Sequence, residues 1–136
     1  MEISAEKECV QFRLYHCKYS GGALAGIRVR DAAEVCAQAV RSVRWIMDPR
    51  WLIEHLKQRE RRHLGGRPTR FEKGSLRTLM NLKRRLRKLR CRYEICIVQP
   101  GISKAHCNPE ISTMLGAASN LVSEMTGLPL KVIASA

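Results

Sequence analysis

The sequence predicts an α/β fold in which a small mixed sheet is flanked by helices. Three stretches have strand character, at residues 9–18, 93–98 and 130–134. The stretches between them carry apolar residues at helical spacing, three or four positions apart. The chain closes with a strand, a helix and a strand, an order that is typical of two parallel neighbours joined by a crossover helix.

The first strand is predicted from alternation. Val10, Phe12 and Leu14 take every second position, with more polar residues between them. A period of two places these three side chains on one face of a strand. Ser-Gly-Gly at 20–22 then ends the strand and begins a loop that we expect to reach residue 29.

A core helix is predicted to follow, with Asp31 as its N-cap. Glu34 lies three residues further on, which is the spacing of a capping box. Residues at helical spacing form one broad apolar stripe, namely Ala32, Val35, Cys36, Ala39, Val40, Val43, Ile46 and Met47. A stripe of this width is typical of a helix that packs on a core.

Two more helices are predicted on either side of a loop. Asp48-Pro49 begins the first of them, because Asp is a good cap and Pro suits the first helical position. Its apolar side comprises Trp51, Leu52, His55 and Leu56. Residues 60–73 are polar and basic and contain Gly and Pro, so they predict an exposed loop. Ser75 caps the second helix, whose leucines are Leu76, Leu79, Leu82, Leu86 and Leu89.

The remaining elements form the closing strand–helix–strand unit. The strand at 93–98 is predicted to end at Pro100 and Gly101. Asn108 caps a helix with Pro109 in its first turn, and Gly127 ends that helix. Its predicted buried stripe is Ile111, Met114, Leu115, Ala118, Leu121, Val122 and Met125. Residues 130–134 are the final strand.

The positive charge is concentrated in one part of the chain. The chain has 136 residues, the size of one domain, and a formal net charge of +13. Residues 44–92, the basic segment, hold 17 Lys or Arg and four Asp or Glu, which accounts for the whole excess. A solvated surface usually mixes both signs, so the predicted partner is a polyanion, with nucleic acid first. The expected nucleic-acid-binding residues are Arg67, Arg70, Lys83, Arg84, Arg85, Arg87 and Lys88.

Composition also indicates how and where binding occurs. Aromatic residues make up only 5%, which favours contact with a nucleic-acid backbone over stacking on bases. A secretory signal and a run of ~18 apolar residues are both lacking, so we expect a cytoplasmic protein without a membrane partner. Zinc ligation by Cys91, Cys96, His106 and Cys107 is a weaker alternative, because their spacing matches no familiar zinc motif.

The candidate catalytic residues lie where the first strand ends. His16 and Lys18 are two positions apart, so they point to the same face. Sites in α/β sheets form at such strand ends. A Lys there can hold a phosphate or an attacking water, and a His can accept a proton or bind a metal. The alternative is a polar pair that is simply solvated.

Three segments of the chain resemble a bacterial domain that ends large helicase-like or defence-associated proteins. They are residues 14–20 (LYHCKYS), residues 34–38 (EVCAQ) with Arg44-Trp45, and residues 97–104 (IVQPGISK). That domain is similar to the PD-(D/E)xK nucleases, the restriction-endonuclease-like superfamily, and the resemblance extends over nearly the whole chain. It implies a restriction-endonuclease-like sheet and a role in DNA processing, with phage defence as a setting.

The resemblance also implies roles for individual residues. In that superfamily, carboxylates on two strands hold Mg²⁺, which activates water, and a Lys orients the nucleophile. Lys18 matches that Lys, His16 falls at the position of the second acid, and Gln38 matches an auxiliary Gln on the following helix. Two departures are visible: His16 replaces an Asp or Glu, and no Asp-bearing strand is expected before Cys9. We therefore expect the domain to be truncated at its N-terminus, and whether it is a metal-dependent DNA endonuclease stays open.

Two other functions remain as alternatives. One is a non-catalytic module that binds DNA or RNA. The other is a protein-interaction piece of a larger helicase-like assembly, or a homo-oligomer, that docks through the Leu-rich helix. For the DNA-processing module we expect the basic segment to be inserted between strands, beside the strand end that bears His16 and Lys18. There it would grip double-stranded DNA.

Overall fold

The sheet is mixed and has the strand order β1-β2-β3-β4 within the part of the chain that is described. The structure is a computed structural model and describes residues 1–18, 28–63, 65, 67–103 and 107–134. β1 (Glu2–Ala5) pairs antiparallel with β2 (Cys9–Cys17). β3 (Arg90–Gln99) runs parallel to β2, and β4 (Leu130–Ala134) runs parallel to β3. The fold is therefore α/β, and the parallel pair predicted at the end of the chain is confirmed.

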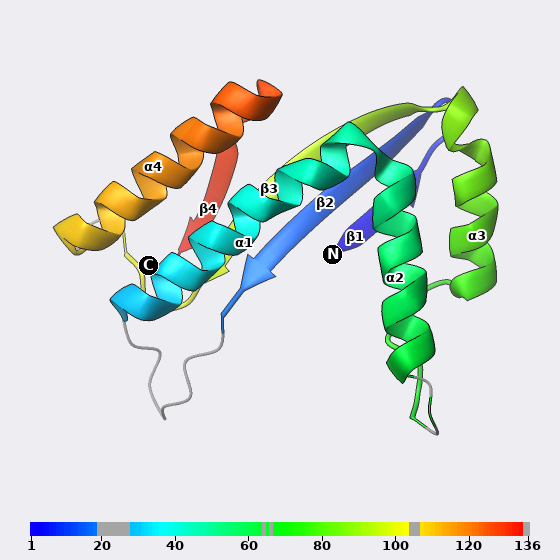
Figure 1. Cartoon of the computed structure of the whole chain (residues 1–136), viewed down its shortest axis with the longest axis horizontal. Helices are drawn as coiled ribbons and strands as arrows, with labels where there is room; N and C mark the ends of the chain where they lie inside the picture. The colour runs from blue at the N-terminus through cyan, green and yellow to red at the C-terminus, as the bar shows by residue number, and fades with distance from the viewer. Residues whose placement is uncertain (19–27, 64, 66, 104–106, 135–136) are drawn as a thin grey trace.

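Two long helices cover one face of this sheet. α1 (Val29–Met47) follows β2, and α4 (Pro109–Thr126) connects β3 to β4. Both connections join parallel neighbours and step across the sheet in the same direction, so right-handed crossovers put both helices on the same face. α1 and α4 pack against each other there (Figure 1).

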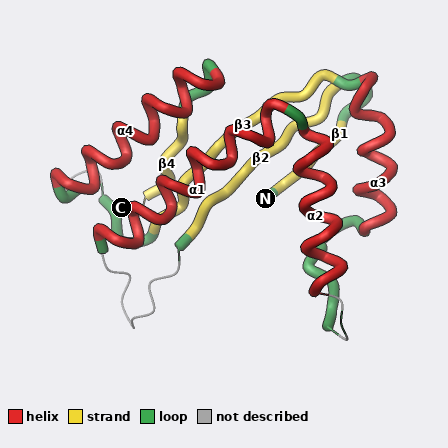
Figure 2. The backbone as a smooth tube through the Cα atoms, in the orientation of Figure 1, coloured by secondary structure: helices red, strands yellow, loops and turns green. Residues whose placement is uncertain are grey.

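The basic segment forms most of the remaining helical structure. It contains α2 (Pro49–His63), α3 (Leu76–Arg85) and the short 3₁₀ helix η1 (Leu86–Lys88). α2 and α3 lie side by side at the end of the sheet where β2 and β3 begin (Figure 2). η1 leads into β3, and the Arg90 N–H donates to the Glu8 carbonyl, 3.0 Å away, just before β2. The helices of the basic segment thus attach to the amino-terminal edge of the parallel strands.

One core joins the sheet to α1, α2, α3 and α4. Phe12, Val35, Ile53 and Val122 belong to it, and all four are fully buried. The leucines of α3 and η1 also belong to this core, since Leu79 and Leu86 are buried and Leu76, Leu82 and Leu89 pack against them. The Leu-rich side of this helix therefore packs inside the protein and is not a free docking surface.

Local signals begin three helices, and end one of them, where the sequence predicts. The side chains of Asp48, Ser75 and Asn108 each accept a backbone N–H from the first turn of α2, α3 and α4, at 2.9, 3.2 and 2.8 Å. Gly127 ends α4 with a φ of 68°, a left-handed conformation that a residue with a Cβ rarely adopts. Each capping side chain and its backbone partner lie within a few residues of each other, so the sequence alone reveals the cap.

α1 begins earlier than predicted. Arg28, rather than Asp31, is the N-cap residue, and its carbonyl accepts the N–H groups of Asp31 and Ala32 at 3.0 and 3.1 Å. Asp31 lies buried in the first turn, and Ala32 packs with Ile102 and Ile111. Packing against the chain that follows β3 extends the helix by a turn, so the capping box predicted at Asp31 and Glu34 is wrong.

α2 also extends further than predicted, to His63. Glu60 was placed in an exposed loop, but its side chain is only 4% exposed within α2. Its carboxylate accepts the Thr69 hydroxyl and lies 3.3 Å from the Arg70 N–H. The helix continues because the chain beyond it returns to cover Glu60.

Some residues of the predicted apolar stripes are exposed. Met47, Trp51, Leu121 and Met125 are between 46% and 77% exposed. β4 forms the edge of the sheet, so α4 has no strand beyond β4 on which Leu121 and Met125 could pack. Helical periodicity predicted these helices correctly, but the predicted buried faces were wider than the observed ones.

The edge strand β1 was not predicted. The sequence predicted that no Asp-bearing strand precedes Cys9, and β1, the strand that lies there, carries Glu2 and no Asp. β1 has four residues, of which only Ile3 is partly buried, so its alternation is too short to recognise. Glu2 on β1 binds Arg13 on β2 at 3.0 Å.

The predicted loop at 20–28 and the zinc candidate His106 lie outside the described residues, apart from Arg28.

The sheet face opposite α1 and α4 is not covered by any described helix. Strand pairing places Glu94 and Lys131 on this face, where they form an ion pair of 2.8 Å. Cys96 lies on the same face as Glu94, whereas Cys91 lies on the face towards α1, so the strand separates these two zinc candidates.

No described helix is both long enough and apolar enough to cross a membrane.

Candidate nucleic-acid interface

The two sets of candidate residues lie at opposite ends of the sheet. His16 and Lys18 lie at the carboxyl end of β2, whereas η1 leads into the amino end of β3. β2 has nine residues, so at about 3.3 Å per residue its ends are about 26 Å apart. The expectation that the basic segment lies beside His16 and Lys18 is therefore wrong. The reason is α1, whose 19 residues return the chain to the amino-terminal edge before α2 begins.

Lys18 and Gln38 meet at a carboxylate that the sequence had assigned to a capping box. The Lys18 Nζ lies 2.6 Å from Glu34 Oε2, and the Gln38 Nε2 donates to Glu34 Oε1 at 3.4 Å. The hydrogen bond from Lys18 holds the pKa of Glu34 below its usual value. Two of the three predicted catalytic residues are thus brought together, by way of Glu34 on α1.

His16 continues the face of β2 that α1 covers. Val10, Phe12 and Leu14 on that face are buried, and His16 is partly buried beyond them. Burial lowers the pKa of His16, and the positive charges of the chain's amino terminus and of Arg41 lower it further. The ring nitrogen Nε2 is buried without a hydrogen-bond partner. His16 therefore takes no part in the contacts that join Lys18, Glu34 and Gln38.

The donors at this end of the sheet do not match the metal site that the resemblance implies. Mg²⁺ prefers several oxygen ligands, above all carboxylates. Glu34 supplies one carboxylate, which already binds Lys18. Within the described ranges, no group of three or more His, Cys, Asp or Glu is placed to hold a metal ion. The described residues therefore do not fit a two-carboxylate Mg²⁺ site here.

At the other end of the sheet, basic side chains of α3 and η1, with Arg50 of α2, line an open cavity on the surface. The cavity has a volume of about 520 Å³ and is lined by Arg50, Met80, Lys83, Arg84 and Arg87. Three of the predicted nucleic-acid-binding residues, Lys83, Arg84 and Arg87, are thereby brought together. Positions 80, 83, 84 and 87 are three or four apart, so they lie along one side of the α3–η1 helix.

The other predicted nucleic-acid-binding residues are exposed but do not line this cavity. Arg85 on α3 and Lys88 on η1 are exposed outside the lining of the cavity. Arg67 and Arg70 are exposed in the stretch between α2 and α3, where the Arg70 backbone N–H is tied to Glu60. These four side chains extend the basic surface beyond the cavity.

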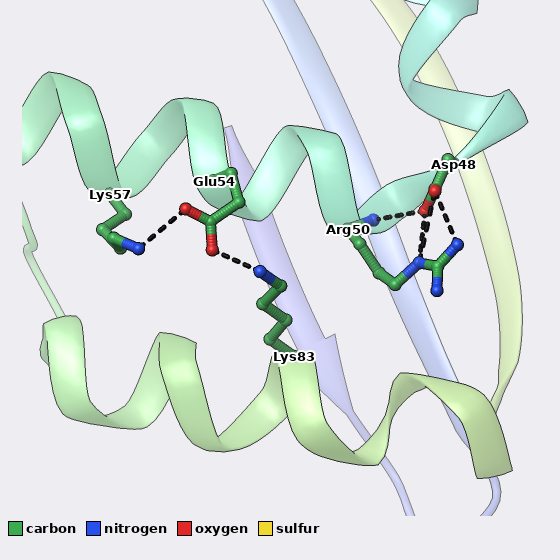
Figure 3. A network of polar contacts seen from close by, with 5 residues as sticks. All are labelled: Asp48, Arg50, Glu54, Lys57 and Lys83. Carbon is green, nitrogen blue, oxygen red and sulfur yellow. Dashed lines mark hydrogen bonds and ion pairs between the residues drawn. The ribbon is translucent and has the colours of Figure 1, made fainter.

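Two carboxylates hold basic side chains in place around the cavity (Figure 3). Asp48 binds the Arg50 guanidinium through two nitrogens, with Nε 2.9 Å from Oδ1 and Nη2 2.8 Å from Oδ2. Glu54 on α2 binds Lys57 at 2.7 Å and also binds Lys83 on α3. Hydrogen bonds from these two lysines lower the pKa of Glu54 to about 2. Glu54 therefore stays ionised and links the two helices.

Sequence reasoning missed Arg50, Met80 and Glu54. Met80 could have been found, because it shares the helical side of Lys83, Arg84 and Arg87. Arg50 and Glu54 come from another helix, and no pattern within α3 indicates that they lie opposite it.

Comparisons with models of protein families, with curated proteins and with solved structures find no match to this chain.

Proposed function

We propose that this protein binds nucleic acid through the basic segment, chiefly by contacts to phosphates. One observation carries the proposal, the imbalance of charge on α2, α3 and η1. Residues 49–88 contain 14 Lys or Arg and three Glu. Two of these carboxylates are engaged internally, since Glu54 binds two lysines and Glu60 is buried against Thr69. Most of the positive charge on this surface is therefore left for an external polyanion.

The aromatic residues of the basic segment favour backbone contact over base stacking. The Trp45 ring packs against the His55 ring, with 5.0 Å between their centroids, and the Arg44 guanidinium lies over the Trp45 ring, 4.1 Å from its centroid. Phe71 is partly buried against the core, so only Trp51 is well exposed. A single exposed aromatic does not form a stacking platform. Double-stranded DNA is the polyanion we propose, since it is the partner that the sequence resemblance implies.

The proposal is tested by measuring duplex affinity as a function of salt. Fluorescence anisotropy of a labelled 20-base-pair DNA would be recorded at several salt concentrations. The logarithm of the association constant should fall linearly with the logarithm of salt, with a slope of about 0.9 per phosphate contacted. Sequence should matter little, because phosphates carry no base identity.

A pair of matched variants locates the interface. Arg67→Gln with Arg70→Gln removes two exposed charges from the basic segment. Arg28→Gln with Arg30→Gln removes two exposed charges near the start of α1, at the opposite end of the sheet. The first pair should weaken binding more than the second. Equal weakening, or wild-type binding that salt does not affect, would refute an interface on the basic segment.

Phosphodiester cleavage is a second candidate function, in a restriction-endonuclease-like protein. It is favoured by the meeting of Lys18 and Gln38 at Glu34, at a strand end where α/β proteins build sites. A cleavage assay on plasmid DNA with Mg²⁺ or Mn²⁺ tests it, with Lys18→Ala as the comparison. Cleavage by the wild type that Lys18→Ala abolishes would support the candidate, and equal inactivity of both would refute catalysis by this chain alone.

The setting of the protein is also part of the proposal. We infer a cytoplasmic module that works within a larger helicase-like, defence-associated assembly or as a homo-oligomer. All six cysteines are free thiols, which is usual in a reducing compartment. Chromatographic mass measurement with and without duplex DNA would distinguish a monomeric DNA-binding module from an oligomer.

A further inference from the structure

The open cavity of α3 and η1 contains more positive charge than its own carboxylates neutralise. Arg50 and Lys83 are paired with Asp48 and Glu54. Arg84 donates to the Asn81 side-chain oxygen at 2.9 Å, an uncharged acceptor. Among the described residues no carboxylate lies within ion-pair distance of Arg84 or Arg87. Two of the four cations around the cavity are therefore uncompensated.

Such an arrangement suits an anion. Like charges that line one cavity repel each other, and a bound anion relieves that repulsion. Guanidinium groups present several N–H donors in a planar fork that matches two oxygens of a phosphate. Three of the four cations here are Arg, which favours a phosphate over an anion without paired oxygen acceptors.

The two ion pairs prepare the cavity for binding. Asp48 is fixed by capping α2, and it holds the Arg50 guanidinium with three contacts of 2.8–3.2 Å. Glu54 holds Lys83 across the gap between the helices (Figure 3). Less side-chain freedom is then lost when an anion enters. Met80 adds an apolar wall, against which the sugar next to a phosphate can pack.

We propose that this cavity binds one backbone phosphate of a nucleic-acid strand, with Arg84 and Arg87 as its main contacts and Arg50 and Lys83 as preordered neighbours. The inference rests on the proposed nucleic-acid function and locates one contact within it. It also divides the predicted basic residues into two classes. Those of the cavity bind a particular phosphate, whereas Arg67, Arg70, Arg85 and Lys88 contribute only general attraction.

The test compares two double variants that remove the same charge. Arg84→Gln with Arg87→Gln empties the cavity of its unpaired cations. Arg85→Gln with Lys88→Gln removes two charges from the same helical region outside the cavity. Affinity for the labelled 20-base-pair duplex would be measured over a series of salt concentrations, and circular dichroism would confirm that each variant is folded.

The cavity pair should weaken binding about tenfold or more, because hydrogen bonds to a charged group are lost. Its salt slope should fall by about 0.9, the value for one phosphate contact. The control pair should weaken binding less and leave the slope nearly unchanged. Equal losses in the two variants would overturn the cavity as a phosphate site and leave the proposed function standing. An absence of duplex binding by the wild type would overturn both.

A third variant addresses geometry. Arg84→Lys with Arg87→Lys keeps the charge and removes the planar forks. If the cavity binds a phosphate through guanidinium groups, this variant should lose a substantial part of the affinity that the Gln variant loses. Wild-type affinity in the Lys variant would show that charge alone suffices and would overturn the proposed contacts of Arg84 and Arg87.

Discussion

The ammonium group of Lys18 at the end of β2 lies 2.6 Å from a carboxylate oxygen of Glu34 on α1. The strand supplies the Lys and the helix supplies the acid, so the two halves of this cluster come from different elements. The pair is also accessible, since the two side chains are 34% and 41% exposed. Its place at a strand end suggests a functional role, and its exposure suggests a small role in stability.

Lys18→Met should leave the midpoint of urea unfolding close to that of the wild type. Exposed ion pairs contribute little, because water and salt screen them. Lys131→Met is the matched control, since Lys131 forms a similar exposed pair with Glu94 at 2.8 Å. A large loss of stability in Lys18→Met alone would show that the cluster is structural.

Asp48→Asn should strengthen binding to duplex DNA by about two- to fivefold, because removing a negative charge beside the cavity outweighs the loss of order in the Arg50 side chain. Asn is as good an N-cap as Asp, so α2 should keep its start. Fluorescence anisotropy at low salt would measure the gain. Glu110→Gln in the first turn of α4 removes the same charge elsewhere. An equal gain in both variants would contradict a specific effect at the cavity.

The stability of the protein should fall as the pH is lowered from 7 to 5.5. The pKa of His16 in the folded protein is lowered by burial, so the unfolded chain binds more protons than the folded chain below about pH 6.5. Protonation therefore favours unfolding in this window. The pKa of His55 is also lowered by burial and contributes in the same direction.

His16→Leu should reduce that pH dependence. The variant removes the group that must be deprotonated on burial, and Leu extends the apolar face of Val10, Phe12 and Leu14. Urea unfolding at pH 7 and 5.5 would measure the difference for wild type and variant. Part of the dependence should remain because of His55. The same pH dependence of stability in both proteins would mean that burial does not lower the pKa of His16.

Glu60→Ala should destabilise the protein by about 1–3 kcal/mol, because it removes the part-buried hydrogen bonds that the Glu60 carboxylate accepts from the Thr69 hydroxyl and the Arg70 N–H. Glu60→Gln is the control, since its amide oxygen can still accept a hydrogen bond. Urea unfolding and amide hydrogen exchange at Arg70 would measure the effect. Equal stability of Glu60→Ala and wild type would show that the stretch after α2 is not tied down by this side chain.

Local rules were sufficient for elements whose signals lie close together in the chain. β2 follows from alternation, and the starts of α2, α3 and α4 follow from capping residues whose partners lie two or three positions away. The same rules failed at Asp31, where burial against the chain after β3 outweighed a good capping signal. They also failed at β1, which is held by its pairing with β2 rather than by its own pattern.

The sequence by itself determined that Val10, Phe12 and Leu14 share the buried face of β2, and that the positive charge is concentrated in one segment. Tertiary structure decided what the candidate site residues meet. Glu34 reaches Lys18, and Arg50 reaches the cavity beside Arg84, only because helices pack across each other. It also decided that the two sets of candidate residues lie at opposite ends of the sheet. The physical reason is that periodicity fixes the direction of a side chain within its own element, whereas its neighbours depend on how elements bury their apolar faces together.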